Sequence, residues 1–192
     1  MKSSSSTFVT HPLAPVWSPE SRILLLGTMP SPASRKSGFY YMHPQNRFWK
    51  VHPFLFGERL TFENNAPDIK AAVSERKDFL LRHNIALWDV LAGCQIEGAS
   101  DSSIRQEIPN DFTEIFSNSK IRHIFFTGKT AEALWKKHCE KHYTIRRGFS
   151  DEKLIQFNIP STCLPSTSPA NARFTMKKLI EEYKIVKDKL NS

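Results

Sequence analysis

The amino-acid sequence predicts an α/β fold in which a mostly parallel sheet is covered by helices on both faces. Short apolar runs of the kind found in buried strands alternate with segments of helical character. The polar loops follow the apolar runs, an order typical of strand–loop–helix units. The length of 192 residues predicts a single domain over 1–192, with residues 1–20 as an extended N-terminal arm.

The strand predictions rest on apolar runs that end in turn residues. The run RILLLG, residues 22–27, is stopped by Gly27 and Pro30. Further strands are predicted at 85–91 and 121–128, and one or two closing strands at 154–159 and 161–166.

Helices are predicted between and after these strands. Residues 68–82 are amphipathic, and residues 129–142 are also expected to be helical. Asn46 is a candidate cap for a short helix that carries Phe48 and Trp49. The last helix is expected to begin near Pro169, because apolar residues then repeat at alternating spacings of three and four.

The composition points to an anionic partner. The net charge is +8 and the isoelectric point is about 9.5, which favours nucleic acid. The three cysteines, Cys94, Cys139 and Cys163, form no CxxC pair, so neither a disulfide scaffold nor a zinc ribbon is expected. The start of the chain lacks the apolar region of a signal peptide, and no apolar run predicts a membrane span.

The polar loops share a position that matters for function. GTMPSPAS, WDVLAGC, TGKT and LPSTSPAN each follow or end a predicted strand. In open α/β sheets such loops gather at one edge, where ligands bind. The chemistry is therefore expected at one edge of the single domain.

Two motifs that suggest other activities are incomplete. TGKT lacks the glycine of a phosphate-binding loop, because His123 stands at that position. Gly128 and Lys129 could still hold one phosphate at a helix start, although an ordinary strand-to-helix turn explains them equally well. His138 and His142 have the spacing of metal ligands on a helix, but no third ligand is evident, so no metal site is predicted.

The segments YYMHPQNRFW, residues 40–49, and LPSTSPAN, residues 164–171, hold the densest groups of candidate site residues. The aromatic residues of the first segment can belong to the core, and Asn46 can be a cap rather than a catalyst. A helix start with Ser168 as N-cap explains Ser168 and Pro169 in the second segment. It leaves unexplained a set of polar residues that suit a phosphate: Ser166, Thr167, Asn171 and Arg173.

Taken together, GTMPSPAS, YYMHPQNRFW and LPSTSPAN resemble the motifs of the uracil-DNA glycosylase superfamily, and most of all those of its hypoxanthine-DNA (deoxyinosine) glycosylase branch. The similarity extends from about Arg22 to about Lys189 and includes WDVLAGCQIEGASDSSI, residues 88–104. It implies a three-layer α/β/α sandwich with a central, mostly parallel sheet of four or five strands. It also implies hydrolysis of the bond between a damaged base and its deoxyribose, after the nucleotide has been turned out of the duplex.

The resemblance also implies roles for individual residues. In other branches an acidic or amide residue stands where this chain has Met29, so the asparagine of the HPxN element, Asn46, is the implied catalytic residue. Its amide can orient a water molecule or hydrogen-bond the departing base. Tyr41 is the implied stacking residue. The remaining residues of the implied base pocket are Met29, Pro30, Ser31 and His43, and His43 can equally be structural.

The implied contacts to DNA lie in the last loop and at the basic positions. The resemblance implies that residues 165–171 enter the minor groove. The implied DNA-binding residues are Ser166, Thr167, Ser168, Pro169, Asn171, Arg173 and Lys129, and Arg35 and Lys36 are further candidates for phosphate contacts.

The sequence therefore predicts a monofunctional DNA glycosylase of base-excision repair that releases hypoxanthine from deoxyinosine and leaves an abasic site. Two alternatives stay open: release of uracil or mismatched thymine by the same fold, and a non-catalytic module that binds DNA. No metal and no cofactor are expected. The expected partner is damaged double-stranded or single-stranded DNA, with no membrane. The expected state is a monomer in the cytoplasm, associated with the nucleoid in a bacterium.

Overall fold

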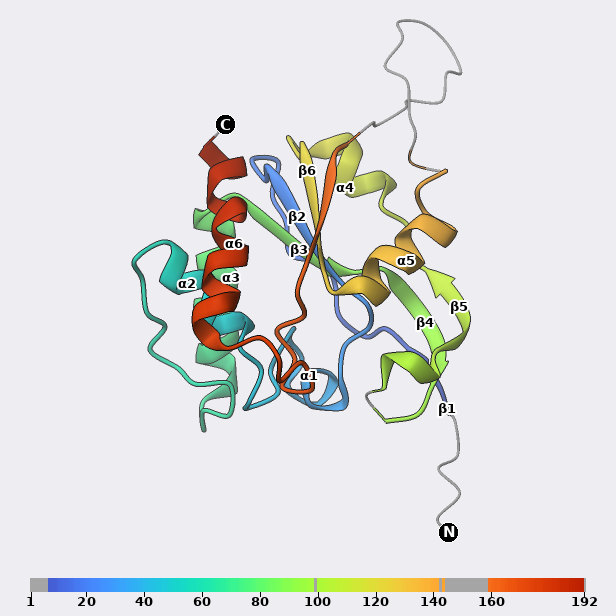
Figure 1. The fold of residues 1–192 in the computed structure, drawn as a ribbon, viewed down its shortest axis with the longest axis horizontal. Helices are drawn as coiled ribbons and strands as arrows, with labels where there is room; N and C mark the ends of the chain where they lie inside the picture. Colours follow the sequence, from blue (N-terminus) through green and yellow to red (C-terminus); the bar gives the residue numbers. More distant parts are fainter. Residues whose placement is uncertain (1–6, 99, 142, 144–158, 192) are drawn as a thin grey trace, which may run out of the picture.

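The centre of the molecule is a parallel sheet of four strands. The computed structural model describes residues 7–98, 100–141, 143 and 159–191 (Figure 1). The strand order is β3 (Ile85–Asp89), β2 (Ile23–Gly27), β6 (His123–Thr127) and β7 (Ser161–Leu164). This arrangement confirms the α/β prediction. Of the strand predicted at 154–159, residues 154–158 lie outside the described residues.

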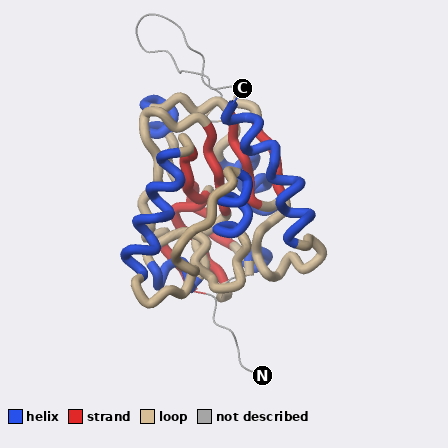
Figure 2. The backbone as a smooth tube through the Cα atoms, turned by 90° about the vertical axis from the view of Figure 1, so that its left-hand side faces the viewer, coloured by secondary structure: helices blue, strands red, loops and turns tan. Residues whose placement is uncertain are grey.

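The strand side chains alternate between two cores, because successive residues of a strand point to opposite faces. Leu25 of β2 packs in a core with residues of α2 (Phe48–Leu55), α3 (Ile69–Arg82) and α6 (Met176–Asn191). Its neighbour Leu24 packs in the other core, with residues of α4 (Thr113–Asn118) and α5 (Lys129–His138). Figures 1 and 2 show helices on both sides of the sheet, which makes three layers.

A second, antiparallel sheet was not predicted. Its order is β1 (Thr7–Thr10), β4 (Leu91–Ile96) and β5 (Arg105–Pro109). β4 begins two residues after β3 ends, so the segment predicted as one strand at 85–91 belongs to two strands. β5 is largely exposed and has the sequence RQEIP, which lacks the apolar alternation that marks a half-buried strand. A short 3-10 helix, Asp101–Ser103, lies between β4 and β5.

The last helix begins at Met176, so the prediction of a start near Pro169 with Ser168 as N-cap was wrong. The side chain of Arg47 explains the difference. Its guanidinium group donates hydrogen bonds to four backbone carbonyls of the loop. In a helix these carbonyls would accept from backbone N–H groups, so the guanidinium takes the place of those donors. These carbonyls belong to Thr167, Ser168, Asn171 and Phe174.

Two other helices lie close to their predicted positions. α3 starts after Asp68, whose side chain accepts a hydrogen bond from the N–H of Ala71 at 2.9 Å. α5 starts at Lys129 as expected, but it ends at His138, four residues earlier than predicted. None of the helices in the described part of the chain has the length and apolar character needed to cross a bilayer.

Candidate active site

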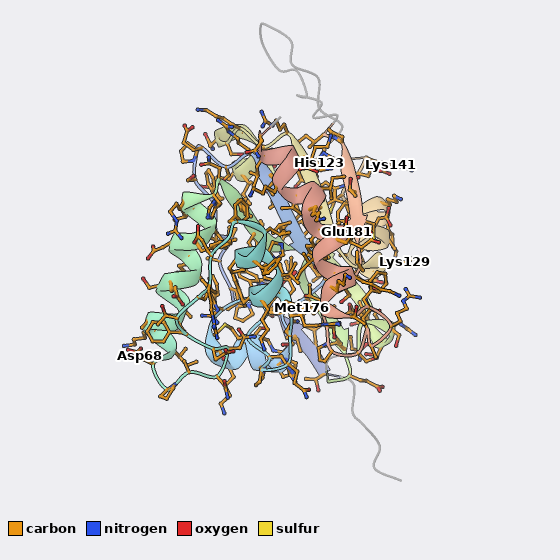
Figure 3. All side chains as sticks on the ribbon, turned by 60° about the vertical axis from the view of Figure 1, so that its left-hand side comes forward. Asp68, His123, Lys129, Lys141, Met176 and Glu181 are labelled. Atoms are coloured by element: carbon orange, nitrogen blue, oxygen red, sulfur yellow. The ribbon has the colours of Figure 1, made fainter. Side chains whose placement is uncertain are left out.

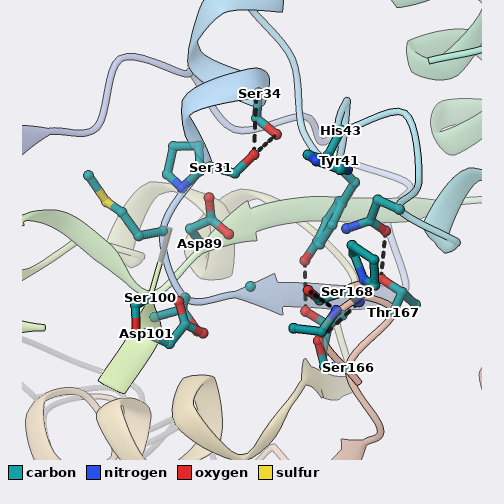
Figure 4. Close-up of a pocket in the computed structure, with 18 of the residues that line it drawn as sticks. Ser31, Ser34, Tyr41, His43, Asp89, Ser100, Asp101, Ser166, Thr167 and Ser168 are labelled. Carbon is teal, nitrogen blue, oxygen red and sulfur yellow. Dashed lines mark hydrogen bonds between the residues drawn. The ribbon is translucent and has the colours of Figure 1, made fainter. Parts of the chain in front are cut away.

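A pocket of about 620 Å³ lies at the carboxyl ends of the parallel strands (Figure 4). It is lined by Gly27, Asp89 and Thr127, the last residues of β2, β3 and β6. The loop after β7 adds residues 166–171. The loops that follow the strands therefore meet at one edge of the sheet. The next two strands of this sheet in the chain, β3 and β6, lie on opposite sides of β2, and ligands commonly bind at such a switch point. The volume is in the range of sites that enclose a small molecule.

Most of the residues singled out in the sequence line this pocket. They are Met29, Pro30, Ser31, Tyr41, His43, Asn46, Ser166, Thr167, Ser168, Pro169 and Asn171. Two basic residues are placed elsewhere. Lys129 is exposed at the start of α5 (Figure 3), and Arg173 borders a separate groove next to α6.

Asn46 stands just before α2, and its side-chain carbonyl is fully occupied. Its Oδ1 atom accepts one hydrogen bond from the backbone N–H of Phe48 and one from the hydroxyl of Thr167, both at 2.9 Å. An N–H can only donate, so the oxygen of the amide must face Phe48. No described residue bonds Nδ2 of Asn46. Asn46 therefore caps the first N–H of the helix and also leaves an amide donor at the pocket.

A second asparagine, Asn64, holds the turn that carries Asn46. Its Nδ2 donates to the carbonyls of Tyr41 at 3.2 Å, His43 at 2.9 Å and Asn46 at 3.4 Å. Its Oδ1 accepts from the guanidinium of Arg76 at 3.0 Å. Arg76 projects from α3 and is only 1% exposed. A buried chain of hydrogen bonds therefore ties the turn to α3.

Tyr41 is held in an uncommon backbone conformation with a φ of 57°. Phe48 stacks on its ring at a centroid distance of 4.0 Å and an angle of 2°. The hydroxyl of Thr127 donates to the carbonyl of Leu26 at 3.2 Å, so the Tyr41 hydroxyl donates to Thr127 at 2.7 Å. Burial, reinforced by the nearby charge of Asp89, raises the pKa of Tyr41 well above its usual value. The phenol is therefore a fixed neutral group. Strained backbone of this kind is often found at functional sites.

Asp89 places a buried carboxylate at the base of the pocket. Its side chain is only 4% exposed, and Oδ2 lies 3.0 Å from Nε2 of His11. Nδ1 of His11 accepts the N–H of Leu13 at 3.2 Å, so the proton of a neutral His11 is on Nε2 and points to Asp89. A Cβ at Gly27 would lie 2.1 Å from Oδ1 of Asp89 and 2.6 Å from the Tyr41 hydroxyl. Only glycine leaves room for the two side chains.

Asp101 adds a second carboxyl group to the pocket (Figure 4). The hydroxyl of Thr28 donates to its Oδ2 atom at 3.1 Å. Removal from water raises the pKa of Asp101, and the charge of Asp89 raises it further, whereas the bond from Thr28 lowers it. The pocket of this basic protein is therefore acidic on one side.

The loop after β7 presents its residues in two directions. The Oγ atom of Ser166 accepts the N–H of Ser168 at 3.2 Å, and Oγ of Ser168 accepts the N–H of Ala170 at 3.3 Å. Both hydroxyls keep their own hydrogen for donation to an anion. Thr167 between them is 1% exposed and turns toward Asn46.

The described residues favour neither a thiol nucleophile nor a metal site. Burial raises the pKa of Cys139 to about 12 and that of Cys163 to about 11, so both thiols are protonated and poorly nucleophilic near neutral pH. No three or more metal-ligating side chains cluster within the described ranges. His142, one of the two histidines of helical spacing, lies outside those ranges.

Four residues that build the site were not singled out in the sequence. Asp89 had a usable signal, since it is a polar residue that ends the apolar run IALWD. Arg47, Asn64 and Arg76 had none, because their partners lie in other elements. For Arg47 the bonded carbonyls are more than a hundred residues away along the chain.

Comparison with known proteins identifies relatives of this chain. Two proteins named Hypoxanthine DNA glycosylase are similar in sequence. The one from Methanosarcina acetivorans is 32% identical over 160 residues, which cover 82% of this chain and 85% of that protein. The one from Methanosarcina barkeri is 33% identical over 118 residues, which cover 60% of this chain and 68% of that protein.

The fold is shared with a solved structure. The solution NMR structure of a candidate uracil DNA glycosylase from Methanosarcina acetivorans has a TM-score of 0.70 and 27% sequence identity. The match covers 97% of this chain and 100% of that one. The model of the Uracil DNA glycosylase superfamily matches residues 14–188, a span that contains every loop of the pocket. This chain therefore belongs to the uracil-DNA glycosylase superfamily.

Proposed function

We propose that this protein is a monofunctional DNA glycosylase that hydrolyses the N-glycosidic bond of deoxyinosine, releases hypoxanthine and leaves an abasic site. Membership of the superfamily and the similarity to two proteins named Hypoxanthine DNA glycosylase support this proposal. The observation that carries it is the amide of Asn46, which holds a donor at a pocket of suitable size while its carbonyl is bound.

Asn46 acts on the charge that the reaction creates. Cleavage of an N-glycosidic bond leaves an oxocarbenium-like sugar and places negative charge on the departing base. Water then adds to the anomeric carbon, and the proton that it loses neutralises the base. Nδ2 of Asn46 donates a hydrogen bond to that base, and one such donor contributes a factor of about 10²–10³ to the rate of comparable reactions. The occupied Oδ1 atom supports this role over that of an acceptor that orients water.

The pocket receives the base after it has left the duplex. A deaminated base is mispaired or weakly paired, so it is turned out at a lower cost than a normal one. The ring of Tyr41, supported from behind by Phe48, stacks on the base. Met29, Pro30, Ser31 and His43 enclose it.

Asp89 selects the base by its hydrogen-bonding edge. Oδ2 is engaged by His11, and Oδ1 is left as an acceptor beside Gly27. Hypoxanthine presents a donor at N1, whereas adenine presents a lone pair there. A carboxylate oxygen therefore attracts the deaminated purine and repels the normal one.

The protein binds DNA through its basic residues and the loop after β7. The hydroxyls of Ser166 and Ser168 and the charges of Lys129 and Arg173 bind phosphates. Pro169 and Asn171 belong to the part of the loop that enters the minor groove. The protein acts as a monomer inside the cell, on chromosomal DNA.

Single-turnover release of base tests the proposal. The substrates are matched duplexes that contain one deoxyinosine, uracil or xanthine, or a guanine–thymine mismatch. We expect release of hypoxanthine, and we expect Asn46→Ala to lower its rate by about 10²–10³ with little change in duplex affinity. Gln45→Ala, at the exposed neighbour of Asn46, is the matched control and should keep the wild-type rate.

A carboxylate in place of the amide separates the two roles of Asn46. The Asn46→Asp variant can still accept hydrogen bonds from Phe48 and Thr167 but has no N–H for the base. We expect it to be at least as slow as Asn46→Ala. If Asn46→Asp kept most of the activity, the result would instead support a group that aligns water.

Release of uracil is the second candidate function. Uracil also carries a ring N–H beside a carbonyl, so Oδ1 of Asp89 can accept from it as well. Uracil release without hypoxanthine release would move the protein to a neighbouring branch. Duplex binding without release of any of these bases would leave a DNA-binding module.

A further inference from the structure

We propose that Thr167 is a positioning residue that fixes the amide of Asn46 with its N–H group toward the base. This inference rests on the proposed function, because it concerns how the donor for the departing base is held in place. Thr167 was expected from the sequence to contact DNA, together with its neighbours Ser166 and Ser168. Its burial and its partner in the structure support a different task.

Thr167 is directed into the protein. Thr167 is 1% exposed, and its hydroxyl lies 2.9 Å from Oδ1 of Asn46. Its backbone carbonyl accepts the N–H of Arg47 at 3.2 Å and Nε of Arg47 at 3.2 Å. The position of Thr167 is therefore set by the residue that follows Asn46 in the chain.

Two donors are needed to hold an asparagine amide. The last torsion of an asparagine side chain has a broad energy profile, so one hydrogen bond leaves the amide plane free to turn. The N–H of Phe48 holds Oδ1 from the side of the helix, and the hydroxyl of Thr167 holds it from the side of the loop. Rotation of the amide by half a turn would place its N–H₂ group against the N–H of Phe48, and two donors repel. Nδ2 is therefore kept in one direction.

This arrangement gives the loop after β7 two tasks. Ser166 and Ser168 keep hydroxyl hydrogens for phosphates, and Thr167 uses its hydrogen on Asn46. The guanidinium of Arg47 binds four carbonyls of the same loop and fixes it against α2. The residues that contact DNA and the residue that orients the catalytic amide are thus on one rigid segment.

Replacement of the hydroxyl by a methyl group tests the inference. Thr167→Val keeps the shape of the side chain and removes the donor. We expect single-turnover release of hypoxanthine to fall by about 10-fold, while the dissociation constant of the deoxyinosine duplex stays within about 2-fold. Thr167→Ser restores the hydroxyl and should recover most of the rate. Thr61→Val, the same change at an exposed threonine, is the control and should behave as wild type.

A double-mutant cycle separates positioning from general destabilisation. If Thr167 acts through Asn46, Thr167→Val has no further effect on the rate in an Asn46→Ala background. An equal 10-fold loss in both backgrounds would overturn the inference, as would a Thr167→Val variant that is as fast as wild type. A wild-type protein that releases no hypoxanthine would overturn the proposed function and this inference with it. Failure of the proposed function is therefore seen in the wild-type protein, whereas failure of this inference alone is seen only in the variants.

Discussion

The His11–Asp89 pair has a direction that an isolated carboxylate would lack. The Nε2–H of His11 needs an acceptor, because Nδ1 is already engaged by the N–H of Leu13. An asparagine at position 89 would therefore turn its carbonyl to His11 and its N–H₂ group to the pocket. The hydrogen-bonding character of the pocket would change from acceptor to donor while its shape stayed the same.

Asp89→Asn is consequently expected to change which base is preferred. An N–H₂ group opposes the N1–H of hypoxanthine and matches the N1 lone pair of adenine. We expect hypoxanthine release to fall by about 10²-fold and the preference for hypoxanthine over adenine to narrow. Single-turnover release from duplexes with deoxyinosine or deoxyadenosine measures both. Asp78→Asn, at an exposed position of α3, is the control. A preference that is unchanged in Asp89→Asn would place base selection elsewhere.

Helix α2 links the site to the stability of the fold. It begins two residues after Asn46, and on its inner face His52 contacts both Phe48 of the same helix and Tyr183 of α6. His52 is fully buried, with its Nδ1–H donated to the carbonyl of Phe48 at 3.0 Å. Its Nε2 atom has no hydrogen-bond partner among the described residues. Burial without a partner disfavours the charged ring and lowers the pKa of His52 to about 4.

This pKa shift predicts a loss of stability in mild acid. Between pH 6.5 and about 4 the unfolded chain binds a proton at His52 that the folded protein does not bind. The free energy of unfolding therefore rises with pH through this window and falls as the solution is acidified. The contribution of His52 to that fall is about 3 kcal/mol.

Urea unfolding at pH 7 and pH 4.5 measures this effect. His52→Leu cannot take up a proton, so its free energy of unfolding should change less between the two pH values than that of wild type. Equal changes in the two proteins would assign the acid sensitivity to other groups.

At the scale of the whole molecule, two lysines lie at opposite ends of β6. The net charge is +8, and Lys129 follows the carboxyl end of β6 on the side of the pocket. Lys120 precedes β6 at the other end of the strand, where it pairs with Glu20 at 2.6 Å. Replacing either lysine by alanine changes the net charge by the same amount. A comparison of the two variants therefore separates the effect of the lysine's position from the effect of net charge.

The salt dependence of DNA binding distinguishes these positions. Each phosphate contact contributes about one unit to the slope of log affinity against log salt concentration. We expect Lys129→Ala and Arg173→Ala each to reduce that slope by about one unit, and Lys120→Ala to leave it unchanged. Fluorescence anisotropy of a labelled duplex over a range of salt concentrations provides the slopes. A common change in all three variants would indicate an effect of net charge alone.

The sequence by itself determined the fold class, the strands of the parallel sheet and the edge at which the pocket lies. It could do so because each of these follows from local patterns, such as the run ILLLG of β2 with all five residues buried. It also indicated the turn with Asn46 and the loop with Thr167, because both segments are dense in candidate site residues and resemble motifs of a known family. The second sheet was missed, since β5 is short, exposed and polar.

Only the tertiary structure decided how these residues work together. The start of α6, the direction of the Asn46 amide and the support of its turn depend on Arg47, Thr167 and Asn64. Asp89 depends in the same way on His11 of the N-terminal segment. Each of these hydrogen bonds joins residues that are far apart in the chain, and their orientation is fixed by which groups can donate and which can accept. Local patterns contain no record of such pairs, so the sequence could point to Asn46 as a candidate but could not predict how its side chain is held.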